Sequence, residues 1–192
     1  QVARGLMALD VNKGDRVGIW AMNYAEWIIV QFATAKIGAI MVNINPSYRT
    51  FELEYCLKQS EIKLLILQGR FKTSDYVGMF YETCPEAYES RPGRILSEKF
   101  PFLKTVVFMG DIPYNGMYQW DDLLKKAESI SQDELIEREK ALDFDDAINI
   151  QYTSGTTGYP KGVVLTHHGV LNNGYIIGEG MGFTEKDRLC IP

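Results

Sequence analysis

Short runs of apolar residues alternate with segments of helical hydrophobic spacing along most of the chain. An apolar run between turn residues is typical of a buried strand, and apolar positions three or four residues apart are typical of a helix. The predicted strands are 16–20, 39–44, 63–67, 104–109, 147–152 and 163–166. The predicted helices are 2–10, 23–37, 50–59, 73–84, 120–129 and 131–141. Because parallel strands need a covering element between them, this alternation predicts a layered α/β domain with a parallel sheet.

Polar residues predict where two of these helices begin. Asn23 can cap the free N–H groups of the first turn, and Glu26 stands three residues later, where a capping box needs an acid. Thr50 is the predicted cap of the next helix. Both ends of the chain are abrupt, because residues 2–10 have the pattern of a helix tail and residues 187–192 that of an interrupted strand. We therefore expect the natural chain to extend in both directions.

The residues with the clearest chemistry form one loop between two predicted strands. The loop reads Thr153-Ser154-Gly155-Thr156-Thr157-Gly158-Tyr159-Pro160-Lys161. Glycines let the backbone approach a ligand and turn its N–H groups inward, and hydroxyls donate to phosphate oxygens or reach a bound Mg²⁺. Lys161 adds a mobile positive charge, and Pro160 stiffens the turn that presents it. The loop is therefore predicted to bind a polyphosphate.

This loop differs from the common P-loop, in which lysine directly follows the second glycine and a helix comes next. Here Lys161 stands three residues after Gly158, and the run that follows is strand-like. We therefore expect loop amides, hydroxyls and Lys161 to hold phosphate, rather than a helix dipole. A plain hairpin turn is the competing interpretation, because Gly, Ser and Thr are common in turns between strands.

The ten residues TSGTTGYPKG resemble the phosphate loop of the ANL superfamily of adenylate-forming enzymes at every defined position. This superfamily includes acyl-CoA and aryl-CoA synthetases, peptide-synthetase adenylation domains and luciferases. The resemblance covers essentially the whole chain, including GDRVGI at 14–19, Glu26-Trp27 and Asn45-Pro46. It continues after the loop in LTH at 165–167 and VLNN at 170–173, which resemble a strand-to-helix passage.

Within the superfamily, several stretches are similar to the medium-chain branch called acyl-CoA synthetase family member two. These stretches are 45–57, 68–73, 84–85 and 146–158. The resemblance implies that residues 1–192 are an incomplete, layered parallel-sheet part of the large N-terminal AMP-binding domain. It also implies that the chain lacks the beginning of that domain, its later subdomains and the C-terminal lid domain.

The same resemblance implies a parent enzyme that is an ATP-dependent acyl-CoA synthetase, a fatty acid–CoA ligase. Such an enzyme lets a carboxylate attack the α-phosphorus of ATP, and the thiol of coenzyme A then takes the acyl group from the acyl-adenylate. Carried over by position, residues 153–161 would wrap the β- and γ-phosphates. Thr156 would be the hydroxyl on the Mg²⁺ side, and Lys161 would neutralise pyrophosphate. The other catalytic segments are absent from this sequence, so we expect the isolated chain to be inactive.

Two other functions stay open on the sequence alone. The chain can belong to another adenylate-forming enzyme, such as an aryl-CoA ligase or a peptide-synthetase adenylation domain. It can also be a module that binds ATP without chemistry. The residues that would select the acid and its acceptor lie in segments outside this sequence, so neither alternative is excluded by the loop.

Charge and cysteine content narrow the class of partner. The net charge of −5 argues against a dedicated nucleic-acid surface. The three cysteines, Cys56, Cys84 and Cys190, are far apart and odd in number, so we expect neither a disulfide framework nor a metal site. A reducing compartment is therefore the expected environment. No apolar run reaches the ~20 residues of a membrane span. We expect a cytoplasmic protein, or a mitochondrial-matrix protein in a eukaryote. Its expected small-molecule substrates are fatty acid, ATP and coenzyme A. We also expect exposed surfaces of the chain to pair with a second copy, which would make a homo-oligomer.

Two further groups of residues invite a functional interpretation. The adjacent His167 and His168 suggest a metal, but no other histidine and no cysteine is near them in sequence, so we expect a structural role and a helix start at His167. Asp145 and Asp146 are also adjacent, and neighbours on an extended chain point to opposite faces. Shared acid–base work by these two carboxylates is therefore not expected.

Overall fold

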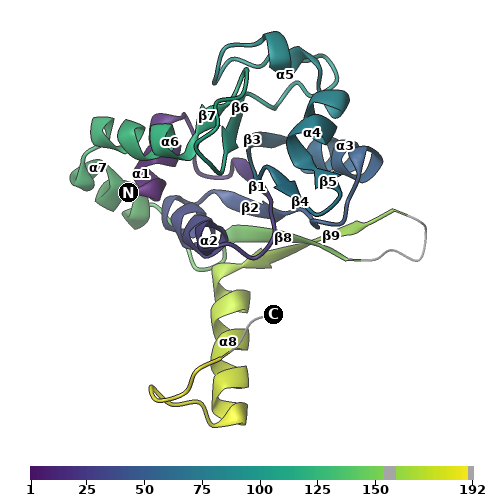
Figure 1. The fold of residues 1–192 in the computed structure, drawn as a ribbon. Coiled ribbons are helices and arrows are strands. Elements are labelled where there is room, and N and C mark those ends of the chain that lie inside the picture. The colour runs from purple at the N-terminus through teal and green to yellow at the C-terminus, as the bar shows by residue number, and fades with distance from the viewer. Residues whose placement is uncertain (154–158, 190–192) are drawn as a thin grey trace.

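The computed structural model describes residues 1–153 and 159–189 of the 192-residue chain. Its centre is a seven-stranded sheet in the order β7-β6-β3-β1-β2-β8-β9 (Figure 1). The strands are β1 (Arg16–Trp20), β2 (Ile40–Asn43), β3 (Ile62–Leu67), β6 (Thr105–Phe108), β7 (Tyr118–Gln119), β8 (Ala147–Thr153) and β9 (Lys161–Thr166). The described neighbours pair in parallel, except that β8 and β9 are antiparallel. The predicted α/β class with a mainly parallel sheet is confirmed.

Helices cover both faces of the sheet (Figure 1). Alternate residues of β3 show the division, because Leu65 and Leu67 belong to one buried cluster whereas Leu64 and Ile66 belong to the other. The first face carries α3 (Thr50–Gln59), α4 (Tyr76–Thr83) and α5 (Glu86–Glu89). The second face carries α1 (Val2–Ala8), α2 (Ala25–Ile37), α6 (Trp120–Lys126) and α7 (Gln132–Lys140), with the 3-10 turn η1 (Ala127–Ser129) after α6. Burial on both faces explains why these strands are apolar runs.

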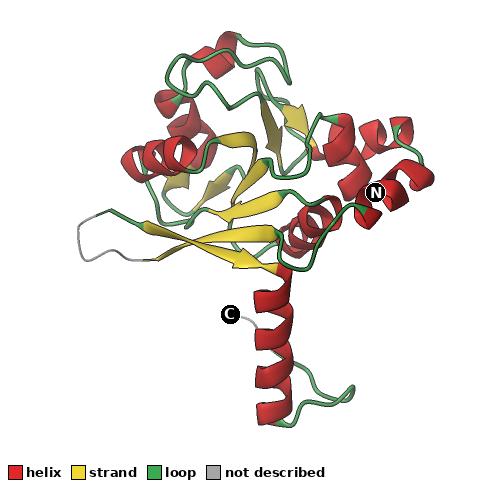
Figure 2. Ribbon diagram, turned by 180° about the vertical axis from the view of Figure 1, so that it is seen from behind, coloured by secondary structure: helices red, strands yellow, loops and turns green. Residues whose placement is uncertain are grey.

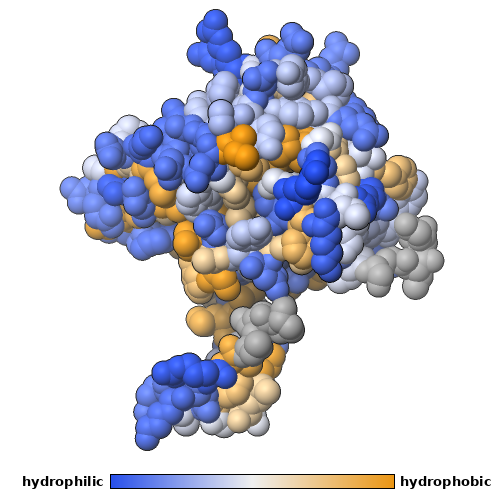
Figure 3. All heavy atoms as spheres, viewed as in Figure 1, coloured by the Kyte–Doolittle hydropathy of each residue, from blue (hydrophilic) through white to orange (hydrophobic). Residues whose placement is uncertain are grey.

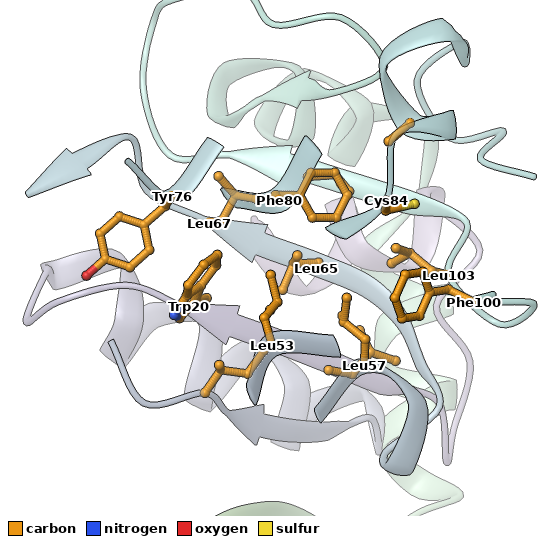
Figure 4. Close-up of a cluster of buried hydrophobic side chains, with 14 of the residues drawn as sticks. Trp20, Leu53, Leu57, Leu65, Leu67, Tyr76, Phe80, Cys84, Phe100 and Leu103 are labelled. Atoms are coloured by element: carbon orange, nitrogen blue, oxygen red, sulfur yellow. The ribbon is translucent and has the colours of Figure 1, made fainter. Parts of the chain in front are cut away.

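Trp20 lies in the first cluster, at the end of β1, and fixes the segment that follows β2 (Figure 4). Its ring meets that of Tyr76 edge-on, with 4.7 Å between centroids. The indole N–H of Trp20 donates to the backbone oxygen of Asn45 at 3.2 Å, and the hydroxyl of Tyr76 donates to that of Pro46 at 2.9 Å. Buried aromatic rings with satisfied polar ends thus hold this segment at the carboxyl end of β2.

The helix predicted over 73–84 begins later, at Tyr76, because the preceding residues form a small hairpin. Its strands are β4 (Arg70–Phe71) and β5 (Ser74–Asp75), and they pair antiparallel. Lys72 in the turn has a φ of 53°, in the left-handed region. Asp75 then caps α4, since its carboxylate accepts from the N–H of Gly78 at 2.9 Å. A local turn therefore replaces the first turn of the expected helix.

Two other helix starts also differ slightly from the prediction. Tyr24, rather than Asn23, occupies the position before α2. Arg49, rather than Thr50, occupies the position before α3, and its N–H donates to the carboxylate of Glu52 at 3.0 Å. The start of α3 thus involves the carboxylate of Glu52, which the sequence analysis did not single out, rather than the hydroxyl of Thr50 that was expected to cap it.

The helix α8 (His167–Met181) projects away from the body of the molecule (Figures 1 and 2). None of its residues is buried. Apolar side chains stand on its surface (Figure 3), and the large exposed ones are Leu171, Tyr175, Ile176, Ile177 and Met181. Since helices gain most of their stability from packing of an apolar face, these side chains have no such support here.

The end of the described chain does not form the expected strand. Residues 187–189 are outside any strand, which corrects that part of the strand predicted over 187–192. A strand needs a neighbour to accept its backbone hydrogen bonds, and this segment follows the projecting α8 instead. The remaining residues, 190–192, lie outside the described residues. No helix in the described ranges is long and apolar enough to cross a membrane.

Candidate phosphate-binding site

The predicted phosphate loop joins β8 to β9 in a hairpin. The pairing runs from Ala147 opposite Thr166 to Thr153 opposite Lys161, so the two ends of the loop lie side by side. The predicted residues Ser154, Gly155, Thr156, Thr157 and Gly158 lie outside the described residues. Their roles, including that of Thr156 beside Mg²⁺, therefore stay predictions.

Lys161 and Thr153 stand at the open end of this hairpin. The hydroxyl of Thr153 donates to the backbone oxygen of Lys161 over a long 3.5 Å. The side chain of Lys161 is exposed, and none of the ion pairs found among the described residues involves it. Its ammonium group is thus exposed, as binding of an anionic ligand would require, and that binding role stays a prediction.

The loop leaves the sheet at the edge where β1 and β2 also end, because β8 runs parallel to β2 and β2 to β1. A hollow of about 300 Å³ lies at this edge. It is lined by Ala21, Asn23, Trp27, Asn43, Ile44, Asn45, Pro46, Gln151 and Tyr152. Ligands of open α/β sheets usually bind outside the carboxyl ends of the strands. The hollow and the base of the loop are therefore parts of one candidate site.

The lining of the hollow is neutral and rich in side-chain amides. Asn43 donates from Nδ2 to Oδ1 of Asn149 at 3.4 Å, whereas its own Oδ1 is buried with no hydrogen-bond partner among the described residues. An orphaned buried acceptor is costly unless a ligand or water donates to it. The neutral, amide-rich lining of the hollow thus suits an uncharged polar group.

Tyr152 ties the first end of the loop to α3. Its hydroxyl lies 2.6 Å from Oγ of Ser60, the residue that follows the last residue of α3. Burial raises the pKa of Tyr152, so its hydroxyl stays protonated and acts as a hydrogen-bonding anchor. Burial likewise raises the pKa of the Cys56 thiol to about 12 and that of Cys84 to about 11, which makes both poor nucleophiles.

The second end of the loop also contacts α3, through Tyr159. Its ring centroid lies 5.2 Å from that of Tyr55 and 6.0 Å from that of Phe51. The motif gives no role to Tyr159, which stands at its variable position, and none to the two α3 residues. The four-residue spacing of Phe51 and Tyr55, which places them on one helix face, is the signal that points to a paired aromatic surface.

The histidine and aspartate pairs lie at the other end of the β8–β9 hairpin, away from the loop. His167 is the first residue of α8, in agreement with its expected helix-start position. His168 Nδ1 lies 3.5 Å from Asp145, and Asp146 pairs with Lys13 at 2.7 Å. The hydrogen bond from Lys13 lowers the pKa of Asp146. Within the described ranges, no group of three or more His, Cys, Asp or Glu could hold a metal ion.

The family described as AMP-binding enzyme matches residues 1–192, the whole chain. This chain is an AMP-binding family member. The matched range includes TSGTTGYPKG, whose phosphate-binding role stays a prediction.

Curated relatives of this AMP-binding protein are named acyl-CoA synthetases or ligases. YngI of Bacillus subtilis, provisionally named an acyl-CoA synthetase, is 49% identical over 100% of this chain and 35% of its own length. The mitochondrial medium-chain acyl-CoA ligase ACSF2 of Homo sapiens is 39% identical over 100% of this chain and 32% of its own length. The resemblance to the medium-chain branch is confirmed. The chain spans about a third of the length of these relatives.

Solved structures of related ligases share the fold. A long-chain-fatty-acid-CoA ligase (FadD1) from Archaeoglobus fulgidus is 27% identical with a TM-score of 0.67, covering 97% of this chain and 32% of that chain. The anthranilate CoA ligase AuaEII, solved with anthranoyl-AMP, is 26% identical with a TM-score of 0.63, covering 86% of this chain and 27% of that chain.

Proposed function

We propose that this chain carries the ATP-phosphate site of an acyl-CoA synthetase. The enzyme would activate a medium- or short-chain fatty acid as an acyl-adenylate and pass the acyl group to coenzyme A. The observation that carries the proposal is the loop TSGTTGYPKG between β8 and β9, at the carboxyl edge of the sheet of an AMP-binding family chain. The names of the relatives YngI and ACSF2 support this reaction class.

The described residues supply part of what a site for a nucleoside triphosphate needs. Lys161 offers an exposed cation at the end of the loop, and the neutral hollow at the same edge of the sheet offers side-chain amides. For Mg²⁺, the proposed ligand is the hydroxyl of Thr156, outside the described residues. Mg²⁺, when bound, would neutralise charge on the phosphate oxygens.

The chain's own residues would act by holding charge. Attack of a carboxylate on the α-phosphorus builds negative charge on the departing pyrophosphate. Lys161 would bind the β- and γ-phosphates and stabilise that charge, and the hydroxyls and amides of residues 153–158 would donate hydrogen bonds to the same oxygens. The antiparallel pairing of Thr153 with Lys161 would hold both ends of the loop around these phosphates.

The first prediction concerns the charge of Lys161. In calorimetric titrations with MgATP, we expect saturable binding to the chain and at least about tenfold weaker binding to the Lys161→Ala, Thr156→Ala double variant, since a hydrogen bond to a charged group contributes about 1.5–3 kcal/mol. Lys186→Ala, which removes another exposed lysine, is the matched control. Equal affinity of the double variant and the wild type would contradict the proposal, as would absence of binding.

The proposed domain assignment is that residues 1–192 are one part of the large N-terminal AMP-binding domain. The two half-reactions would then need groups beyond this chain, including those that bind the acid and coenzyme A. We expect no carboxylate-dependent ATP–pyrophosphate exchange from the chain alone. An exchange signal that depends on added fatty acid would refute this assignment.

The proposal extends to compartment and assembly. We propose a cytoplasmic enzyme, or one of the mitochondrial matrix in a eukaryote; the relative ACSF2 is named as a mitochondrial protein. We also propose that the chain self-associates through its exposed apolar surface, which includes α8. Large exposed apolar patches favour association in water.

A further inference from the structure

We propose that Tyr159 is a positioning residue, whose ring clamps the Lys161 end of the phosphate loop onto α3. The inference rests on the proposed function, because it assigns a role within the same site. It concerns the variable position of the motif, to which the motif itself gives no role.

The helix α3 is a rigid base because its inner face is packed in the core. Leu53, Cys56 and Leu57 have exposed fractions of 0%, 0% and 3%, all in the cluster around Trp20. The opposite side of the helix carries Phe51, which is 62% exposed. A side chain on the hairpin that packs against this side is therefore held by an element that the core holds in turn.

Tyr159 makes that contact with two rings. The ring plane of Tyr159 is tilted by 32° to that of Tyr55 and by 38° to that of Phe51, and the ring centroids lie 5.2 Å and 6.0 Å apart. These values lie within the range of favourable aromatic pairs, about 4.5–7 Å. Tyr159 is 50% exposed, so these contacts cover a substantial part of a side chain that an ordinary turn would leave in water.

The clamp acts on Lys161 because only Pro160 separates it from Tyr159. The ring of a proline fixes its φ near −65°, so this link is short and stiff. On the other strand, Tyr152 is bound to Ser60 at the end of the same helix. Both ends of the loop are thus attached to α3, which fixes where the ammonium group of Lys161 can reach.

The test compares Tyr159→Ala with Tyr159→Phe in the full chain. Without nucleotide, we expect hydrogen exchange of the amides of residues 161–163 to be at least threefold faster in Tyr159→Ala and unchanged in Tyr159→Phe, which keeps the ring. With MgATP, we expect about tenfold weaker binding to Tyr159→Ala, and recovery in Tyr159→Phe. Tyr175→Ala, which removes an exposed tyrosine of α8, is the matched control and should change neither quantity.

A second pair of variants tests the contact itself. Phe51→Ala should also speed exchange of residues 161–163, and adding it to Tyr159→Ala should produce little further effect, because both remove one interaction. Additive effects, or unchanged exchange in Tyr159→Ala, would overturn the clamp. If the wild type fails to bind MgATP, the proposed function fails, whereas the exchange measurements without nucleotide still decide for or against the clamp.

Discussion

Leu53 and Phe51 stand two residues apart on α3 and face opposite environments. Leu53 is 0% exposed in the core, whereas Phe51 is 62% exposed beside the hairpin. We expect Leu53→Ala to lower the free energy of unfolding by about 2–5 kcal/mol, because it removes core contacts and leaves a cavity. Phe51→Ala should lower it by less than about 1 kcal/mol. Urea denaturation of both variants measures the difference, and equal losses would contradict this assignment of inner and outer faces.

The residues of the loop could be chosen from the sequence, but their supports could not. The hydroxyls, the glycines and Lys161 predict phosphate binding by their residue types and their order. Tyr159 and its partner Phe51 are far apart along the chain, and no local pattern joins them. Only the fold, which lays the hairpin across α3, brings these rings together. The phosphate-binding role of the loop residues therefore stays a prediction, and the aromatic contacts that support the loop are what the sequence could not supply.

Asp75 caps the start of the helix α4, since its carboxylate accepts from the N–H of Gly78 and pairs with Arg70 at 3.0 Å. These two partners, the backbone N–H first, hold the pKa of Asp75 below its usual value. A lowered pKa in the folded state means that the stabilisation is present above the unfolded pKa and is lost as the pH falls through the folded value.

We therefore expect Asp75→Ala to lower the free energy of unfolding by about 1 kcal/mol at pH 7. The difference between the variant and the wild type should shrink as the pH falls below about 4, where the carboxyl of the unfolded chain becomes protonated. Urea titrations at several pH values measure this. A difference that does not depend on pH would show that the charge of Asp75 plays no part in the cap.

The strands were predictable because burial on both faces makes each an apolar run. The predicted strand 16–20 and the observed β1 have the same bounds. The start of α4 was not predictable from spacing, since the turn at Lys72 and the cap at Asp75 decide it. The two-residue strand β7 is too short for any periodicity. The lack of packing around α8 could not be predicted from the sequence either, because the spacing of its apolar residues is typical of a packed helix.

Exposed apolar side chains lie on α2, β9 and α8. The residues are Ile28, Ile29, Phe32, Val163, Val164, Leu171, Ile176 and Ile177. We expect the chain to form concentration-dependent oligomers, visible in light scattering coupled to gel filtration. Leu171→Glu with Ile176→Glu should weaken them, because burying a charge in an apolar contact is costly. Arg188→Glu is a control at an exposed polar site near α8, and a monomer at all concentrations would contradict the expectation.

The pairing of β8 with its two neighbours sets an order of assembly for the molecule. β8 meets β9 within a local hairpin, but it meets β2 by joining Asn149 to Met41, across most of the chain. Local pairs close quickly, whereas distant pairs wait for the intervening chain to be ordered. During synthesis, β2 keeps an open edge until β8 has left the ribosome. The nascent chain is thus most prone to wrong strand pairing just before the β8–β9 hairpin is complete.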